Sequence, residues 1–276
     1  MPSMFLAHAF QRQLEHDFVV VHWDRRGAGK SFDAARDPGS LTVGRTLEDT
    51  FELSRLLRKR FGHERIYLVA HSWGTYLGLL AVREHPEYYA AYVGMGQLAG
   101  TRTQVEESRH ELLLREVAQA GDERLLHRLK TGKYHVTEED LFRYGGELYG
   151  ARSYWPILRA GLLAPEYTLW DALNVKRGAA LVERTMRYDV LPRPLEGEIS
   201  ELAVPVFLFL GRHDYNTPSS LAAAYLGHLV CPLKEVVWFE HSAHFPFFEE
   251  AERFRAEMAH VEATTRAFWR NRGESL

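Results

Sequence analysis

Short, nearly continuous apolar runs recur toward both ends of the chain and are missing from its middle. They are rich in Val, Ile, Leu and Phe, with little polar alternation. Runs of this kind are typical of strands that are buried on both faces of a parallel sheet. We predict strands over residues 17–23, 66–70, 88–96, 204–210 and 235–239.

Segments with apolar residues at helical spacing separate most of these strands. We predict helices over residues 4–16, 46–61, 75–84, 221–226 and 248–268. For the helix over 46–61 we expect Thr46 as the N-cap and Gly62 as the stop, because these residue types favour those positions. Strands that alternate with helices predict an α/β protein with a mostly parallel sheet and helices on both faces.

The middle of the chain has a different character. Residues from about 101 to 196 are rich in charged residues and helix formers, and they contain no long β-branched run. We interpret this stretch as a helical insertion. The predicted domain organisation is therefore a core made of residues 1–100 and 197–276, with a helical cap over 101–196.

Composition narrows the possible settings and partners. The 276 residues carry a formal net charge of −3, which gives no reason to expect nucleic acid as a partner. Neither an apolar run long enough for a membrane helix nor a signal peptide is visible in the sequence. The single cysteine, Cys231, rules out an internal disulfide framework and fits a reducing compartment. We expect a cytoplasmic protein that acts on a small molecule or short peptide, with its oligomeric state undetermined.

The chemistry centres on the sequence Ala70-His-Ser-Trp-Gly74, between a predicted strand and a predicted helix. The pattern small-x-Ser-x-Gly at such a junction is typical of the nucleophile elbow of serine hydrolases. There Ser72 would be the nucleophile. The Trp73 N–H, at the start of the helix, would point toward a developing oxyanion. Ala70 stands where a glycine is usual, and Gly74 keeps the second flanking position small.

Two further residues follow later strands in the order that this chemistry requires. Asp214 comes after the strand over 204–210, and His244 comes after the strand over 235–239. The carboxyl ends of parallel strands share one edge of a sheet, so Ser72, Asp214 and His244 should meet there. His244 would act as general base, while Asp214 would hold its tautomer and stabilise the imidazolium.

Several other histidines lie close to these positions. His241 is the main competitor of His244 as the base; we prefer His244 because it stands directly before Phe-Pro and the last helix. We expect His71 to be a packing residue and His213 to flank Asp214. No spacing of His, Cys, Asp or Glu resembles a metal site, so we expect neither metal nor cofactor.

A glycine-rich segment over residues 24–31 invites comparison with a phosphate-binding loop. A Walker loop has the spacing G-x-x-x-x-G-K-[ST], and Gly29-Lys-Ser31 would require a glycine where Asp24 stands. We therefore interpret this segment as a turn at the end of a strand, held by Asp24 and Arg26.

Taken together, these motifs resemble the α/β-hydrolase superfamily, and most of all its proline iminopeptidase-like branch. The resemblance rests on residues 23–31 and 70–74, on Gly211-Arg-His-Asp214, and on His241-Ser-Ala-His244 with the Phe-Pro-Phe-Phe-Glu that follows. It covers the core and says much less about residues 101–196. Arg25 replaces a Gln-like residue of the family, and Ala70 replaces its usual glycine.

The resemblance implies release of an N-terminal residue, often proline, from small peptides. In that branch, carboxylates of the cap bind the free amine of the substrate, and here Glu166, Asp171 and Glu183 are the candidates. A solvated helix face explains these three residues equally well. An esterase or lactonase with the same three residues, and a non-catalytic binding protein on the same fold, remain alternatives.

The resemblance also implies an N-terminal truncation. Similar proteins place strands and a His-Gly-Gly-Pro-Gly loop before the first core helix, and a glycine N–H of that loop is an oxyanion donor. This chain opens with Met1-Pro-Ser-Met, which resembles the end of such a loop. We expect an unpaired apolar sheet edge where those strands would pair. We also expect a coding segment upstream of Met1; if there is none, the protein would be weakly active at best, or would complete its site and its sheet with another chain.

Overall fold

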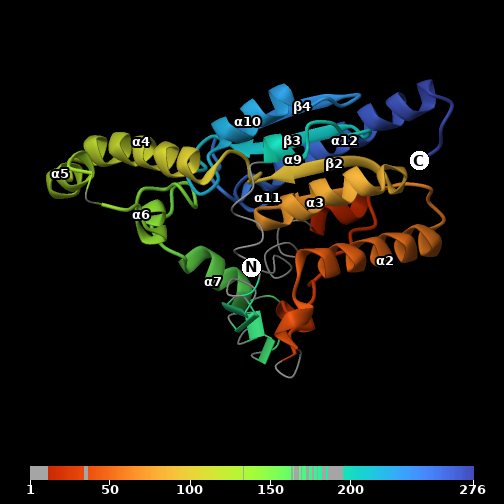
Figure 1. Cartoon of the computed structure of the whole chain (residues 1–276), viewed down its shortest axis with the longest axis horizontal. Coiled ribbons are helices and arrows are strands. Elements are labelled where there is room, and N and C mark those ends of the chain that lie inside the picture. The colour runs from red at the N-terminus through yellow and green to blue at the C-terminus, as the bar shows by residue number, and fades with distance from the viewer. Residues whose placement is uncertain are drawn as a thin grey trace.

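A single sheet of four parallel strands forms the centre of the described structure (Figure 1). The computed structural model describes residues 12–33, 37–132, 134–162 and 195–276, and between the last two ranges residues 164, 168, 170–171, 174–175, 177–178, 180–181 and 185. The strands lie in the order β1 (Ile66–His71), β2 (Tyr89–Met95), β3 (Val206–Gly211) and β4 (Lys234–Phe239). Each matches a strand predicted from an apolar run.

The central strands are buried along their whole length, which accounts for their uninterrupted apolar sequences. All residues of β2 and β3 are buried. Successive side chains enter two different apolar clusters: Tyr92 and Leu208 belong to one, and Val93 and Phe207 to the other. Since both faces of these strands are covered, no polar alternation is needed.

Helices cover both faces of the sheet, as the predicted α/β class requires. Helices α2 (Val43–Phe61), α3 (Trp73–Glu84) and α10 (Ser219–His228) contribute to one apolar cluster. Helix α12 (Ala251–Asn271) and the short α11 (Pro246–Glu249) contribute to the other. None of the helices in the described part of the chain is long and apolar enough to cross a bilayer. Short 3-10 helices are η1 (Arg12–His16), η2 (Gly29–Ser31), η3 (Pro38–Ser40) and η4 (Pro86–Tyr88).

Helix α2 begins earlier than the sequence analysis predicted. Thr42 is the N-cap, and its Oγ1 accepts a hydrogen bond from the Arg45 N–H at 3.1 Å. Thr46 lies inside the helix, where its hydroxyl donates to the Thr42 carbonyl at 2.9 Å. Two threonines four residues apart offered the same capping chemistry, and the extended backbone of Thr42 decides between them. Gly62 ends the helix in the left-handed conformation, as predicted.

The segment between β2 and β3 is helical where the structure describes it. It contains α4 (Arg102–Ala120), α5 (Glu123–Lys130), α6 (Glu138–Arg143), α7 (Trp155–Leu162) and the one-turn α9 (Leu195–Glu198). Helices α4 to α6 extend to one side of the sheet (Figure 1). Helices α4 and α5 form a small apolar cluster of their own through Leu113, Val117, Leu125 and Leu129.

The strand predicted over residues 17–23 does not form, which corrects the sequence analysis. Residues 19–25 form neither helix nor strand, and η1 precedes them; the rest of the predicted helix over 4–16 lies outside the described residues. An apolar run becomes a strand only where a neighbouring backbone receives its hydrogen bonds. Val19 and Val21 are accordingly exposed, by 66% and 46%.

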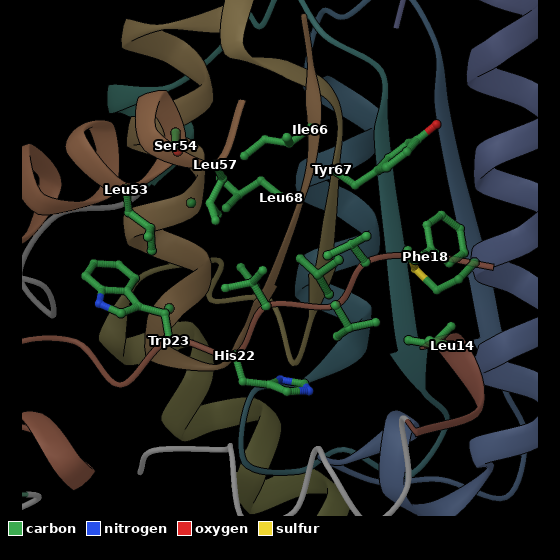
Figure 2. A pocket seen from close by; sticks show the side chains of 18 of the residues that line it. Leu14, Phe18, His22, Trp23, Leu53, Ser54, Leu57, Ile66, Tyr67 and Leu68 are labelled. Carbon is green, nitrogen blue, oxygen red and sulfur yellow. The ribbon is translucent and has the colours of Figure 1, made fainter. Parts of the chain in front are cut away.

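A cavity of about 590 Å³ lies where this run would need a partner strand. It is lined by residues 17–25, by α2 and by β1, the edge strand of the described sheet. Figure 2 shows side chains from these three segments around it, namely Phe18, His22 and Trp23, then Leu53 and Leu57, then Ile66, Tyr67 and Leu68. Hydrogen-bonded strands are about 4.8 Å apart, so the cavity keeps this run out of the ladder with β1.

The glycine-rich segment over residues 24–31 is held by its own side chains. The Asp24 carboxylate accepts the Lys30 N–H at 2.9 Å, and Arg26 forms an ion pair with Asp49 of α2. Gly29 has φ +48, and a Cβ there would meet the Asp24 carboxylate at 2.2 Å. These contacts support the interpretation of this segment as a turn.

Candidate active site

Ser72 lies in a sharp turn between the end of β1 and the start of α3. With φ 54 and ψ −127, it is the one non-glycine residue in the described part of the chain with positive φ. Its N–H pairs with the Met95 carbonyl at 2.9 Å, and its carbonyl accepts the Thr75 N–H at 2.8 Å. Such conformations carry a cost of about 1–3 kcal/mol and persist only where surrounding contacts impose them.

The glycine that is closely packed near this turn is Gly78, whereas the sequence analysis expected Gly74. A Cβ on Gly74 would meet nothing within 4 Å. A Cβ on Gly78, one turn further along α3, would lie 2.7 Å from the Tyr92 ring and 3.1 Å from the Ala70 Cβ. Contact between α3 and the sheet therefore constrains Gly78 more than Gly74, and it leaves room for the single methyl of Ala70.

Asp214 and His244 form a buried hydrogen-bonded pair at the same edge of the sheet. His244 Nδ1 lies 2.9 Å from Asp214 Oδ2, and both residues are 2% exposed. Thr217 anchors the carboxylate, because its N–H reaches Asp214 Oδ1 and its hydroxyl reaches Oδ2, each at 2.8 Å. With Nδ1 facing a carboxylate, the other ring nitrogen of His244 is the one available to a substrate or to Ser72.

The charge around His244 favours its protonated form. Burial acts most strongly and disfavours the imidazolium, but the negative charges of Asp214 and Glu147, with the Asp214 hydrogen bond, outweigh it. The result is a His244 pKa raised to about 9. Within the described structure no hydrogen bond joins the Ser72 hydroxyl to His244, as is common in enzymes without substrate.

His71 connects the Ser72 strand with the His244 segment. Its Nε2 lies 2.7 Å from the His244 carbonyl, and the two imidazole rings lie 4.7 Å apart between centroids. Burial lowers the pKa of His71 well below its ordinary value, with the charge of His244 acting in the same direction. A neutral His71 therefore donates its Nε2–H to that carbonyl. It packs against Phe245 and Phe247, as expected of a packing residue, and also ties two site segments together.

The competing histidines lie differently. His241 is exposed; its N–H donates to Glu250 Oε2 at 3.0 Å, and its ring faces Tyr149 at 5.8 Å. The ring of His213 lies 4.5 Å from that of the same tyrosine, tilted by 34°. Among the histidines of the described residues, His244 is the one that bonds to Asp214, so the geometry favours it over His241 as the partner of that carboxylate.

Two glycines make room for the His244 segment. Gly96, which follows β2, has φ +51, and a Cβ there would lie 2.6 Å from Cε1 of His244. Gly211, at the end of β3, would place a Cβ 1.9 Å from the Ala243 carbonyl oxygen. The ends of β2 and β3 thus touch the loop after β4, which explains how three separate strands fix one imidazole.

Trp73 opens α3, so its backbone N–H belongs to the first turn, where such groups lack partners within the helix. Its indole ring lies under the Arg25 guanidinium, at 3.9 Å from the ring centroid. Burial lowers the pKa of Arg25 to about 10 in spite of the neighbouring Asp24. The Arg25 that replaces the family's Gln-like residue is therefore buried against the residue after Ser72.

Of the three predicted amine-binding carboxylates, the structure describes Asp171. Glu166 and Glu183 lie outside the described residues. The Asp171 carboxylate accepts the N–H and the hydroxyl of Thr168, each at 2.8 Å, and its own N–H donates to the Thr168 hydroxyl. These hydrogen bonds lower the pKa of Asp171. The pattern is that of a capping box, so Asp171 already has a structural role.

The sequence analysis gave no role to two glutamates near His244, the buried Glu147 and the half-buried Glu249. The Glu147 carbonyl accepts the His244 N–H at 3.2 Å, and burial raises the pKa of the Glu147 carboxyl. Glu249 accepts hydrogen bonds from the N–H groups of Ala243 and Phe245, at 2.9 and 3.0 Å. Glu249 ends the Phe-Pro-Phe-Phe-Glu sequence that contributes to the family resemblance, five residues after His244, and this was its signal in the sequence. Among the described residues, no group of three His, Cys, Asp or Glu side chains is placed to hold a metal ion.

Comparison with known proteins gives relatives with peptidase names. The chain is 26% identical over 268 residues to a probable aminopeptidase, YbaC, of Bacillus subtilis, covering 92% of this chain and 82% of that protein. It is 21% identical over 245 residues to a proline iminopeptidase of Saccharolobus solfataricus, covering 85% and 73%. These relatives confirm the predicted resemblance to proline iminopeptidases.

Solved structures share the fold. The crystal structure of a proline iminopeptidase from Mycobacterium smegmatis matches with a TM-score of 0.63 and 17% identity, covering 95% of this chain and 87% of that one. An esterase from Exiguobacterium antarcticum matches with a TM-score of 0.57 and 16% identity, covering 94% and 86%. The alpha/beta hydrolase family matches residues 1–257, and the chain belongs to that family.

Proposed function

We propose that this protein is a serine hydrolase that releases N-terminal residues from small peptides through an acyl-enzyme. The observation that carries the proposal is the buried pair of His244 and Asp214, at the sheet edge where Ser72 occupies its strained turn. A buried imidazole with a fixed carboxylate partner beside a strained serine is the arrangement that nucleophilic catalysis needs.

In the proposed first step, the Ser72 hydroxyl attacks the carbonyl carbon of the scissile bond. Its proton passes to Nε2 of His244, while Nδ1–H stays hydrogen-bonded to Asp214. The negative oxygen of the tetrahedral intermediate is stabilised by the Trp73 N–H. When the intermediate collapses, His244 returns the proton to the leaving amine, and the acyl group remains on Ser72.

In the second step, water attacks the acyl-enzyme and His244 takes its proton. The tetrahedral intermediate collapses, the Ser72 oxygen leaves, and His244 returns the proton to it. Asp214 and Glu147 stabilise the imidazolium in both steps, which agrees with the raised pKa of His244. Thr217 keeps the Asp214 carboxylate from turning away.

We prefer N-terminal residues of peptides as the proposed substrate because the relatives are named aminopeptidase and proline iminopeptidase. In this proposal residues 101–196 form a cap over the site, and the substrate pocket lies between this cap and Ser72. Glu166, Asp171 and Glu183 remain the proposed ligands of the substrate amine. Asp171 would have to give up its capping bonds to Thr168 to serve in this way.

An esterase or lactonase is the second candidate. One observation favours it: of the three candidate amine ligands, Asp171 is the one that the structure describes, and its carboxylate already accepts two hydrogen bonds from Thr168. The same three residues would hydrolyse an ester as well as a peptide. Aminoacyl arylamides compared with acyl esters separate the two. Replacing the three cap carboxylates by Gln should raise KM only for substrates with a free amine.

A fluorophosphonate probe tests the catalytic proposal directly. We expect covalent labelling of the wild type and its loss in Ser72→Ala, with a kcat lower by about 10⁶, the size of the loss when subtilisin loses its catalytic serine. Ser200→Ala, which removes an exposed serine, is the matched control and should label normally. A folded Ser72→Ala protein with more than about a tenth of the wild-type kcat would exclude Ser72 as nucleophile. Absence of labelling in the wild type would favour a non-catalytic binding protein.

A further inference from the structure

The backbone on both sides of His244 is bound by one side chain. Glu249 Oε2 accepts the Ala243 N–H at 2.9 Å and the Phe245 N–H at 3.0 Å. Its other oxygen accepts the Tyr149 N–H at 2.5 Å. Tyr149 belongs to the segment between β2 and β3, so this carboxylate joins that segment to the loop after β4.

Other groups complete the restraint on His244. Its own N–H donates to the Glu147 carbonyl at 3.2 Å, and its carbonyl accepts from His71 at 2.7 Å. The N–H groups of three consecutive residues, 243 to 245, thus all have acceptors, although none belongs to a helix or strand. Two of these three acceptor contacts come from Glu249. Removing it would leave two N–H groups unpaired directly beside the imidazole.

The charge of Glu249 fits this arrangement. Burial raises the pKa of Glu249 to about 7. The N–H groups of Tyr149, Phe245 and Ala243 lower it, and the charge of Asp214 raises it further. In its ionised form this half-buried carboxylate accepts three backbone N–H groups through hydrogen bonds that are shorter and stronger than neutral ones.

We propose that Glu249 is a positioning residue: its carboxylate holds the backbone on both sides of His244 so that the imidazole stays aligned with Asp214. This inference rests on the proposed function, since alignment matters only if His244 transfers protons. Glu249 lies at the end of α11 and acts through the backbone, so it touches neither substrate nor reacting atoms. Small displacements of a catalytic group can lower the rate by about 10²-fold, which sets the size of the expected effect.

The chain offers a matched control in the next residue. Glu250 Oε2 accepts the His241 N–H at 3.0 Å and the Ser242 hydroxyl at 2.7 Å, so it binds the same loop further from the imidazole. Glu249→Ala and Glu250→Ala therefore remove comparable bonds from one loop. A role limited to holding the loop together predicts similar effects for both. Positioning of the imidazole predicts an effect for Glu249 alone.

The experiment measures three quantities for the wild type and the variants. They are kcat and KM with an aryl ester, the second-order rate of fluorophosphonate labelling at Ser72, and the titration of the His244 ring followed by NMR. For Glu249→Ala we expect kcat and the labelling rate to fall by about 10- to 100-fold, with KM within threefold. Glu249→Gln, which keeps one acceptor oxygen, should restore part of the rate. Glu250→Ala should stay within about threefold of wild type in all rates.

Two outcomes would overturn the inference. One is a Glu249→Ala protein with rates within threefold of wild type. The other is an equal loss in the Glu249 and Glu250 variants. If Glu249→Ala does not fold, Glu249→Leu, which is closer in size and also removes both acceptor oxygens, carries the same comparison with Glu250→Ala. If the wild type neither labels nor hydrolyses, the proposed function fails, and the NMR titration decides alone. An unchanged His244 titration in folded Glu249→Gln would then overturn the positioning role.

Discussion

The His244 side and the Ser72 side of the candidate site differ in how many contacts hold them in place. On the His244 side, most residues of the loops after β3 and β4 are buried, and carboxylates accept their backbone N–H groups: Asp214 accepts that of Thr217, and Glu249 accepts those of Ala243 and Phe245. On the Ser72 side, β1 is the edge of the described sheet and only Ala70 in it is buried. The imidazole is therefore held from several directions, whereas the strand that carries the serine has one neighbouring strand.

Exposed apolar side chains mark the same contrast. Several of those in the described structure line the cavity beside β1, namely Val19, Val21, Trp23, Phe61 and Val69. The cavity reaches His71 and Gly74, but its lining does not include Ser72, Asp214 or His244. An open apolar sheet edge is a site for pairing with further backbone. The comparison shows that the loop carrying His244 is held by several hydrogen bonds, whereas the strand before Ser72 has an open edge among the described residues.

The largest expected effect comes from the His244 side. We predict that His244→Ala lowers kcat as much as loss of Ser72 does, because it removes the proposed base that bonds to Asp214. The expected loss is about 10⁶, as for the corresponding residues of subtilisin. His241→Ala, three residues away and exposed, should stay within about threefold of wild type. Steady-state kinetics on variants with unchanged melting curves measure this. The reverse ranking would assign the base to His241.

A smaller loss is expected where β2 touches the imidazole. In Gly96→Ala the new Cβ would lie 2.6 Å from His244, so the ring must move, and kcat should fall by about 10². Gly121→Ala is the control, since that glycine also has positive φ but a Cβ there meets nothing within 4 Å. It should lose about 1 kcal/mol of stability and no activity. A Gly96→Ala enzyme with more than a third of wild-type kcat would show that the imidazole tolerates the displacement.

One pair of residues compares the edge strand with its neighbour directly. Val69 of β1 pairs in register with Val93 of β2, and they are 40% and 0% exposed. Val93→Ala should lower the free energy of unfolding by about 2 kcal/mol, and Val69→Ala by less than about 1 kcal/mol. Urea denaturation measures both. Equal losses would show that the edge of β1 is covered in solution.

The smallest effect concerns pH. The His244 pKa of about 9 places the rise of kcat/KM with pH well above the ordinary imidazole value, because the base must be neutral. Glu147→Gln removes one of the charges that favour the imidazolium, so the rise should shift to lower pH and activity at pH 7 should increase a few-fold. A shift to higher pH would contradict this. The pH profile of kcat/KM for both proteins is the measurement.

The same pKa has a consequence for stability. A folded-state pKa above the unfolded value of about 6.5 means that the His244 ion pair stabilises the fold fully below that pH. The contribution is lost as pH rises through about 9. Melting temperatures measured across this window should fall more in the wild type than in His244→Ala.

Much of this protein follows from its sequence alone. Continuous apolar runs predicted all four strands, because a strand buried on both faces needs no polar alternation. Ser72, Asp214 and His244 each follow one of those runs. Because parallel strands end at the same edge of a sheet, the sequence predicted that the three residues form one site. The structure places Asp214 and His244 in hydrogen-bond contact, and the family match agrees with the predicted fold.

The tertiary structure decided whatever depends on neighbours remote in the chain. Residues 17–23 have the composition of a strand, but a strand also needs a neighbouring strand to share its hydrogen bonds. In the described sheet no strand pairs with these residues. The contacts of Gly96 and Glu249 with the His244 segment depend on distances between loops that no spacing records. Periodicity reports what a residue can bury, whereas hydrogen-bond partners and close contacts are fixed only when distant segments meet.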